Sequence, residues 1–521
     1  MKKISFILMV AVFVLASSCK KDLNQTPLSS TTTSTFYAQP SDFIQAVNAT
    51  YNDLRGYPDR QLFLSEVRSD NIYPTNDVGR DPDPINNFSS NIPANVYVEE
   101  AWTVNYNGIF RANTVLEQIA INGAKIGNAA LATRLTAEAK FLRAFFYFDL
   151  VRFYGKVPLT DHTVLAAEAV TIPRSPVADV YALIISDLQF AVANLPLNYS
   201  STFPNYAATD VGRATKFAAE AMLAKVYMTR SGPTYGIQGP GMGLNEWSLA
   251  LPLLQDVITN GGFVFNPAVY SFPVPATGIF AYANKSPLTN KEAVFDIMFL
   301  TGQSPVLGTT FPWQLVSNGY FNSVNSNTPA NGALGNPNVS NDLIGKYATT
   351  APVDTRRTPF FHTSPYISLS STETKPFLRK YLDTTQVPTS RFDWNVNFIA
   401  TRYTDILMLK AECILHGAPG TQLDVDAIVN QVRARAGQPA IATVTLAQLF
   451  DERRKEFAGE GTRWFDLQRS GNLITIMNAW IAVEDATLHK MSPVTANSII
   501  YPVPQSQLDA APGLYDQNPG Y

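Results

Sequence analysis

The chain has 521 residues, of which 39 are Lys or Arg and 42 are Asp or Glu, so its formal net charge is −3. This balance argues against a nucleic-acid partner, for which a basic patch would be expected. Only two cysteines are present, so disulfides cannot form the framework of a chain this long, and core burial must hold it together.

The N-terminus has the layout of an export signal. MKKISFILMVAVFVLASSCKKD places two lysines before a mostly apolar run, Ile4 to Ala16, which is followed by small residues and Cys19. The run is too short to span a bilayer, which needs about 20 residues. We interpret residues 1–18 as a lipoprotein signal peptide and Cys19 as the lipidation site, although Ala16 stands where such signals usually carry Leu. The alternative is simple signal cleavage near Ser18.

Residues 19–35 are mostly polar and predict a flexible tether. Helical periodicity dominates residues 36–261, and it is strongest in LTAEAKFLRAFFYFDLVRFYG, whose wide apolar face must be covered on more than one side. Residues 213–232 and 402–417 are built alike, each ending at a glycine suited to a left-handed helix cap and each followed by another expected helix. These patterns predict a mainly α fold of tetratricopeptide-like helix pairs forming a superhelical scaffold.

Residues 262–401 differ from the rest in composition. Thirteen prolines lie between positions 265 and 395, and proline removes a backbone donor and stops helices. We therefore expect loops and short strands, as a loop-rich region inserted between helical ones. Because binding residues are common on such loops, this region is expected to carry the ligand site. Residues 402–521 return to helical patterns and form a C-terminal region.

The most charged segment is ERRKEFAGEGTRWFDLQRSG, which begins at Glu452. Thr445 and Gln448 form a capping box, so a helix starts there. Glu452, Glu456 and Glu460 then share one helix face, at a spacing that would suit the two carboxyl groups of a glycosidase. The interleaved arginines and lysine favour a structural interpretation, because nearby cations lower carboxylate pKa values instead of raising one to make an acid.

Two further expectations concern charge and metals. Arg463 is expected to form a buried pair with Glu456, Glu460 or Asp466 where the last helices pack. The histidines have no paired spacing that would place two imidazoles on one metal ion, so no metal or cofactor is predicted; they are His162, His362, His416 and His489.

Several stretches of the sequence form a recognisable set. In the C-terminal part these are YTDILMLKAEC, VNQVRARAG, ERRKEFAGEGTRWFDLQRSG and YPVPQSQLDAAPGLYDQNPGY. In the N-terminal part they are AWTVNYNGIFRANTVLEQI and AEAKFLRAFFYFDLVRFYGKVPL. Together they resemble the SusD/RagB family of outer-membrane nutrient-binding lipoproteins, and the resemblance runs from Cys19 to Tyr521. It implies a non-enzymatic, lipid-anchored protein on the outer face of the outer membrane, which captures glycans, oligosaccharides or sometimes peptides for a SusC-like TonB-dependent transporter.

Glycan binding would need aromatic faces and polar side chains on open loops. Two loops offer both, SDNIYPTNDVGRDPDPINNF and FPWQLVSNGYFNS, whereas Trp102 and Trp464 lie in helical motifs and are expected in the core. The candidate ligand-binding residues, which match no family motif, are Asp70, Tyr73, Arg80, Phe88, Trp313 and Tyr320. Two alternatives stay open: a glycoside hydrolase that uses the carboxylates between Glu452 and Glu460, and a helical-repeat scaffold for protein interactions.

Overall fold

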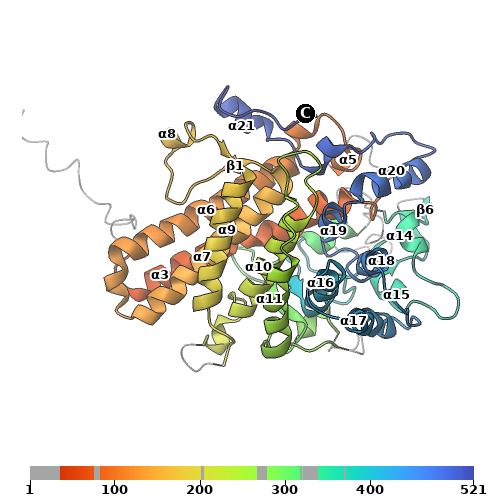
Figure 1. Ribbon diagram of the computed structural model, residues 1–521, viewed down its shortest axis with the longest axis horizontal. Helices are drawn as coiled ribbons and strands as arrows, with labels where there is room; N and C mark the ends of the chain where they lie inside the picture. The colour runs from red at the N-terminus through yellow and green to blue at the C-terminus, as the bar shows by residue number, and fades with distance from the viewer. Residues whose placement is uncertain are drawn as a thin grey trace, which may run out of the picture.

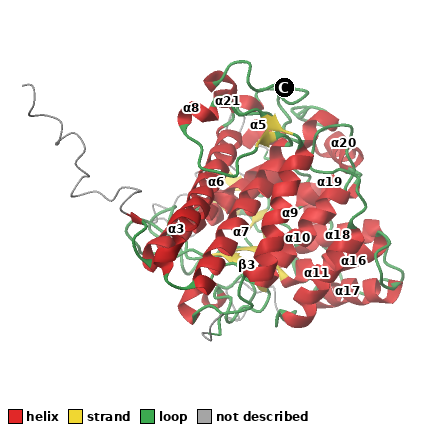
Figure 2. Ribbon diagram, turned by 60° about the vertical axis from the view of Figure 1, so that its left-hand side comes forward, coloured by secondary structure: helices red, strands yellow, loops and turns green. Residues whose placement is uncertain are grey.

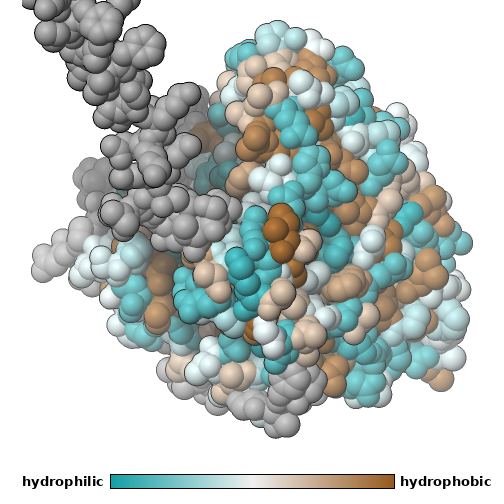
Figure 3. All heavy atoms as spheres, turned by 90° about the vertical axis from the view of Figure 1, so that its left-hand side faces the viewer, coloured by the Kyte–Doolittle hydropathy of each residue, from teal (hydrophilic) through white to brown (hydrophobic). Residues whose placement is uncertain are grey.

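The computed structural model describes residues 36–74, 82–200, 205–266, 278–316, 320, 338–368 and 371–521. Helices follow one another across the molecule from the N-terminal to the C-terminal half (Figure 1). The fold is mainly α, as predicted, and Figure 2 shows how little of it is strand. On the α3 side, hydrophobic residues are scattered among hydrophilic ones (Figure 3), as is ordinary for a protein surface.

The N-terminal helices form a row in which neighbours in the sequence pack against each other. α7 lies against both α6 and α9, and α10 lies against both α9 and α11. Their bounds are α3 (Pro40–Asn52), α6 (Val96–Asn122), α7 (Ala129–Tyr154), α9 (Val177–Asn194), α10 (Lys216–Ser231) and α11 (Trp247–Asn260).

α7 shows why this sequence folds into stacked helices. The Asn128 side chain caps its first turn by accepting a hydrogen bond from the Leu131 N–H. Most side chains from Leu135 onward are buried, because neighbouring helices cover two sides of α7, as its wide apolar face predicts. On α6, a Cβ added to Gly108 would lie 2.3 Å from the Phe146 ring, so this glycine lets the two helices approach closely.

Within the described residues, α9 is long and apolar enough to cross a membrane. Its Val180, Tyr181, Ile184 and Leu188 are fully buried in the same core cluster as the aromatic residues of α7. This is the position of a core helix.

The row continues in the C-terminal part, where α16 packs on both α11 and α17. The predicted capping box is confirmed: Gln448 N–H donates to Thr445 Oγ1, and Thr445 N–H donates to Gln448 Oε1 at 2.9 Å. The helices are α16 (Tyr403–Leu415), α17 (Gln422–Arg435), α18 (Leu446–Glu456), α19 (Arg463–Ser470), α20 (Leu473–Glu484) and α21 (Gln505–Ala510).

The two predicted glycine caps differ. Gly417, after α16, has a φ of +93°, in the left-handed region as expected. Gly232, after α10, has a φ of −64°, so the left-handed cap predicted there is wrong. Close packing is the physical reason for a glycine here, because a Cβ would lie 3.3 Å from the Arg469 Cα.

The proline-rich region contains the short strands that its composition predicts. β3 (Ala293–Ile297) pairs antiparallel with β8 (Phe398–Arg402), which leads directly into α16. β3 is buried on α7, where the rings of Phe295 and Phe141 lie 5.2 Å apart. The other antiparallel pairs are β1 (Val157–Pro158) with β2 (Arg174–Ser175), β4 (Phe361–His362) with β7 (Phe377–Leu378), and β5 (Tyr366–Ser368) with β6 (Ser371–Glu373).

Short helices connect these elements. A π-helical turn, η3 (Leu62–Val67), follows α4 and leads toward Asp70. The short α-helices are α4 (Tyr57–Gln61), α5 (Pro82–Asn86), α8 (Ala166–Ala169), α12 (Phe311–Leu315), α14 (Asn341–Gly345) and α15 (Arg357–Phe360).

Candidate functional site

Asp70 is the anchor of the site. Its side chain is 1% exposed and accepts two hydrogen bonds from Arg463, from Nε at 2.7 Å and Nη2 at 2.8 Å. Arg454 Nη2 lies 3.2 Å from Asp70 Oδ2. Burial alone would raise the pKa of Asp70, but the two guanidiniums outweigh it and lower the pKa to about 2. Asp70 therefore stays ionised at neutral pH.

This pair corrects the partner expected for Arg463. The sequence suggests Glu456, Glu460 or Asp466, which are its neighbours along the chain, whereas the structure pairs Arg463 with Asp70. α19 packs on η3, and the Trp464 N–H donates to Ser65 Oγ at 3.2 Å. The charged C-terminal segment thus fastens the N-terminal region to the last helices.

The predicted ligand loop that contains Asp70 and Tyr73 contacts another part of the proline-rich region, at residues 338–340, which lie outside the second predicted loop. The Tyr73 N–H donates to the Asn338 carbonyl at 2.8 Å, and the Ser340 N–H donates to the Asn71 carbonyl at 3.0 Å. Ser340 Oγ also donates to the Asp70 carbonyl at 2.6 Å. These hydrogen bonds join residues 70–73 to residues 338–340, and we call this junction the base.

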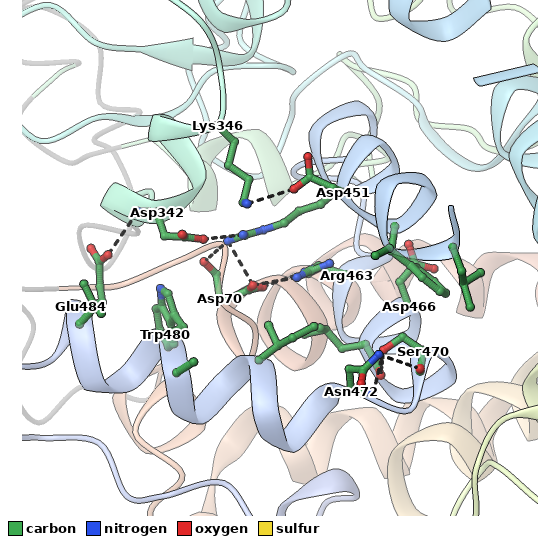
Figure 4. A pocket seen from close by; sticks show the side chains of 18 of the residues that line it. Asp70, Asp342, Lys346, Asp451, Arg463, Asp466, Ser470, Asn472, Trp480 and Glu484 are labelled. Carbon is green, nitrogen blue, oxygen red and sulfur yellow. Dashed lines mark hydrogen bonds and ion pairs between the residues drawn. The ribbon is translucent and has the colours of Figure 1, made fainter. Parts of the chain in front are cut away.

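A cleft of about 730 Å3 opens next to this base (Figure 4). α14, α18, α19 and α20 supply most of its walls. One part of the lining is apolar: Leu446, Ala447, Phe450, Leu467, Ile476, Ala479, Trp480 and Val483. The ionisable part consists of Asp70, Asp342, Lys346, Asp451, Arg454, Arg463, Asp466 and Glu484.

Ion pairs fix the charged side chains of the cleft. Lys346 Nζ lies 3.0 Å from Asp451 Oδ1, and Arg454 Nη1 lies 2.5 Å from Asp342 Oδ2. Burial would raise the pKa of Asp451, but the Lys346 ammonium and other cations lower it overall. The Asp342 and Asp451 side chains are 44% and 43% exposed, so their carboxylates face solvent while remaining paired.

Glu484 and Trp480 come from α20 and face the start of α14 across the cleft. The Glu484 carboxylate accepts hydrogen bonds from the Asn341 N–H at 2.8 Å and the Asp342 N–H at 3.3 Å, and so caps α14. The Trp480 ring packs edge-on against Tyr73, with centroids 6.0 Å apart. Within the described part of the chain, Trp480 Nε1 has no hydrogen-bond partner. Its indole points toward Asp342 and Glu484 (Figure 4).

Four of the predicted binding residues are buried aromatics. Tyr73 is 5% exposed and donates to Asp485 at 2.5 Å, and Phe88 is 8% exposed and covers Arg68. Trp313 is 3% exposed beneath Arg391, and Tyr320 is 7% exposed in an aromatic cluster. The expectation that they form an open platform is therefore wrong, because their large apolar surfaces are used in packing.

The other predicted residues differ in position. Asp70 lines the cleft, although its oxygens are engaged by arginines. Arg80 and Cys19 lie outside the described residues. Trp102 and Trp464 are 3% and 1% exposed, which confirms them as core residues.

The glutamates of the charged segment are buried and ion-paired. Glu456 Oε1 lies 2.8 Å from Arg402 Nη2 and 2.7 Å from Arg435 Nη2. Both arginines also pair with Glu292, and Arg356 Nη1 lies 3.4 Å from Glu456 Oε2. We call these five residues the Glu456 cluster. Each of its side chains is at most 1% exposed.

The two neighbouring glutamates are paired in the same way. Glu460 Oε1 lies 2.5 Å from Lys380 Nζ and 2.9 Å from Arg402 Nη2. Glu452 Oε1 lies 2.6 Å from Arg356 Nη1; burial would raise the Glu452 pKa, but Arg356 and two further cations lower it. Such carboxylates favour the structural interpretation over the catalytic one, since a general acid needs a raised pKa. Among the described residues, no group of three His, Cys, Asp or Glu could hold a metal ion.

Four residues that give the cleft its chemistry were not predicted from the sequence: Asp342, Asp451, Trp480 and Glu484. The α20 sequence offered one hint of a binding surface, because it places a tryptophan on a short, apolar helix. In the structure Val483 of this helix is 78% exposed. Ser340 caps α14, and serine is a common N-cap residue. The position of Asp342 in the first turn of a helix could therefore have been predicted from the sequence. Their convergence depends on tertiary contacts that no local pattern contains.

Two family models match the chain. The model described as "Starch-binding associating with outer membrane" matches residues 31–228, and the SusD family model matches residues 319–521. SusD-like protein P25 of Formosa agariphila is 26% identical, and the alignment covers 99% of each chain. A SusD-like protein of Bacteroides ovatus is also 26% identical, over 70% of this chain and 64% of its own.

Solved structures share the fold. A laminarin binding SusD-like protein has a TM-score of 0.73 at 23% identity, with 93% of this chain and 100% of that chain covered. Surface glycan-binding protein A from Bacteroides thetaiotaomicron, in complex with laminarihexaose, has a TM-score of 0.74 at 23% identity, with 92% and 99% covered. From the family models at both ends of the chain and relatives that match it along its length, we conclude that the chain belongs to the SusD family.

Proposed function

We propose that this protein is a cell-surface lipoprotein that captures glycans or oligosaccharides and delivers them to a partner TonB-dependent β-barrel transporter. Family membership supports this proposal, since one matching family model is described as starch-binding and associated with the outer membrane. Of two proteins with the same fold, one is described as laminarin-binding and the other is in complex with laminarihexaose.

The observation that carries the proposal is the cleft beside Asp70. It has an apolar wall on α18 and α20 and solvent-facing carboxylates at Asp342 and Asp451. A sugar ring has apolar C–H faces and hydroxyl edges. It can therefore pack a C–H face against the apolar wall and direct its hydroxyl groups to the carboxylates. The volume of about 730 Å3 lies in the usual range for small-ligand sites.

We propose that the protein binds without catalysis. In the Glu452–Glu460 segment, the glutamates are buried among cations and cannot reach a polysaccharide chain. A glycoside hydrolase would shorten the bound glycan, whereas a binding protein returns it unchanged. A protein-interaction scaffold would bind no oligosaccharide at all.

The test is titration calorimetry of the full-length protein in detergent micelles against a panel of oligosaccharides. Saturable binding of at least one member, with its chain length unchanged after prolonged incubation, is expected. Shortened products would favour the hydrolase. Failure of every oligosaccharide to bind would refute glycan capture, and a peptide that binds instead would move the function to peptide uptake.

The anchoring and partner parts of the proposal are tested separately. Residues 1–18 would be removed during export, Cys19 would carry the lipid, and residues 19–35 would tether the fold to the membrane. We expect the lipidated protein to co-purify with a large TonB-dependent barrel from detergent-solubilised outer membranes. Recovery of the protein without any barrel would contradict delivery while leaving glycan binding intact.

A further inference from the structure

We infer that the cleft selects neutral glycans and rejects acidic ones such as polyuronates and sulfated chains. This inference rests on the proposed function and specifies the ligand class of the same site. Five carboxylates and three cationic side chains line the cleft. Which of these charges a ligand can reach decides the selectivity.

The cationic side chains that line the cleft are already paired with carboxylates of the protein. Arg463 donates from Nε and Nη2 to the Asp70 carboxylate. Arg454 donates from Nε to Asn71, from Nη1 to Asp342 and from Nη2 to the Asp70 carbonyl, and its Nη2 also pairs with the Asp70 carboxylate. Both arginine side chains are at most 6% exposed. Lys346 is 33% exposed, but its ammonium pairs with Asp451. A sulfate or carboxylate ligand would have to break one of these pairs.

Cations behind the cleft are engaged as well. Arg453 Nε lies 2.9 Å from Asp466 Oδ2, and Arg469 Nη2 lies 2.8 Å from Asp466 Oδ1. Lys455 lies 3.1 Å from Glu452 and 3.6 Å from Asp451. Lys490 Nζ lies over the Tyr73 ring and donates to the Pro74 carbonyl.

Among the side chains that line the cleft, the accessible charge is therefore mainly negative. Asp342 and Asp451 are almost half exposed, and the partly exposed Glu484 carboxylate lies at the same opening. An anionic ligand meets like charges here, and dissolved salt screens such repulsion only in part at distances below the Debye length, about 8 Å at physiological salt. Hydroxyl groups carry no such penalty.

The Trp480 indole gives an independent reason to expect hydroxyl ligands. Its Nε1–H is an unused donor, 5% of the residue is exposed, and the ring points toward Asp342 and Glu484. A hydroxyl can accept from this N–H and donate to a carboxylate at the same time. A sulfate or an ionised carboxylate has no proton to donate, so it cannot complete both contacts.

The test compares matched ligands on the full-length protein in detergent. The probes are neutral hexasaccharides of glucose, mannose or galactose, each beside its partner oxidised at C6 to the uronate. The neutral member of a binding pair should bind at least about tenfold more tightly at low salt, and 0.5 M NaCl should narrow this preference by screening. Equal or tighter binding of the uronate would overturn the inference while leaving glycan capture standing.

Charge variants locate the effect. The double variant D342N/D451N removes two exposed carboxylates and frees Lys346, so it should reduce the preference for neutral glycan at least threefold. The matched control D161N/E168Q changes net charge equally on the exposed loop around α8, far from the cleft (Figure 1), and should leave the preference unchanged. Equal shifts in both variants would overturn the inference. If no hexasaccharide of either class binds, the proposed function fails with it.

Discussion

Replacing Asp70 by Asn should strongly destabilise the fold. Asparagine has nearly the same shape, but one acceptor oxygen becomes an NH2 group that faces arginine donors. Arg463 would then be buried with half of its bidentate contact and without its hydrogen-bonded counter-charge, whereas Arg454 would keep Asp342. Removing one partner from a buried ion pair costs about 3 to 5 kcal/mol.

The pKa of Asp70 gives a second measure of the same interaction. It is lowered from 3.8 to about 2, and each unit corresponds to about 1.4 kcal/mol, so ionisation of Asp70 contributes about 2 kcal/mol to folding. Because the folded-state pKa is depressed, this contribution is complete above the unfolded pKa and is lost as the pH falls toward 2. The substitution has the larger effect because it also leaves the arginines without their acceptor.

Urea unfolding measures both effects. The free energy of unfolding of Asp70→Asn should be about 3 to 5 kcal/mol below that of the unsubstituted protein at pH 7, and this gap should narrow by about 1 kcal/mol between pH 5 and pH 3. Asp451→Asn is the control: it disrupts a pair whose acid is 43% exposed and should cost less than about 1 kcal/mol. Similar losses in the two variants, or a gap that does not change with pH, would show that the ionised Asp70 carboxylate does not stabilise the fold in this way.

Three further substitutions test separate parts of the structure. Trp480→Phe keeps the contact with Tyr73 but removes the unused donor, so glycan affinity measured by calorimetry should fall about tenfold while stability falls by no more than about 1.5 kcal/mol; unchanged affinity would show that the indole N–H does not bind ligand. Trp313→Ala should lower the free energy of unfolding by about 3 to 5 kcal/mol and spare glycan binding, because this side chain is 3% exposed; an unaltered melting temperature with lost binding would restore Trp313 as a ligand residue. Cys19→Ala should move the protein from the outer-membrane fraction to the soluble fraction, and continued membrane attachment would contradict lipidation at this residue.

Much of the fold was predictable because helical periodicity and capping are local. The capping box at Thr445 and the wide apolar face of α7 each specify structure within a few turns of chain. The pairing of β3 with β8 was not predictable, since short strands far apart in the sequence carry no signal of their partners. The prediction of a left-handed cap at Gly232 was wrong because the sequence does not distinguish a glycine that permits close packing from one that adopts a positive φ.

The candidate site was predicted less well, for a physical reason. Aromatic residues on proline-rich loops suggest an open binding surface, but Trp313 and Tyr320 use the same ring area to pack against neighbouring segments. Residue type alone cannot distinguish these two uses. Asp70 was singled out for its polar side chain, yet its role depends on Arg463, which lies almost four hundred residues further along the chain.

The Glu456 cluster has a consequence for how the molecule assembles. Its charges come from distant parts of the chain: Glu292, Arg356 and Arg402 precede α16, whereas Arg435 and Glu456 lie in α17 and α18. Burying a charged side chain away from water without its partner costs a desolvation free energy of several kcal/mol. The C-terminal helices and the region before them must therefore desolvate these charges together, as one cooperative unit. The region between α11 and α16 supplies the counter-ions of the helical scaffold, so it cannot be excised as an independent module.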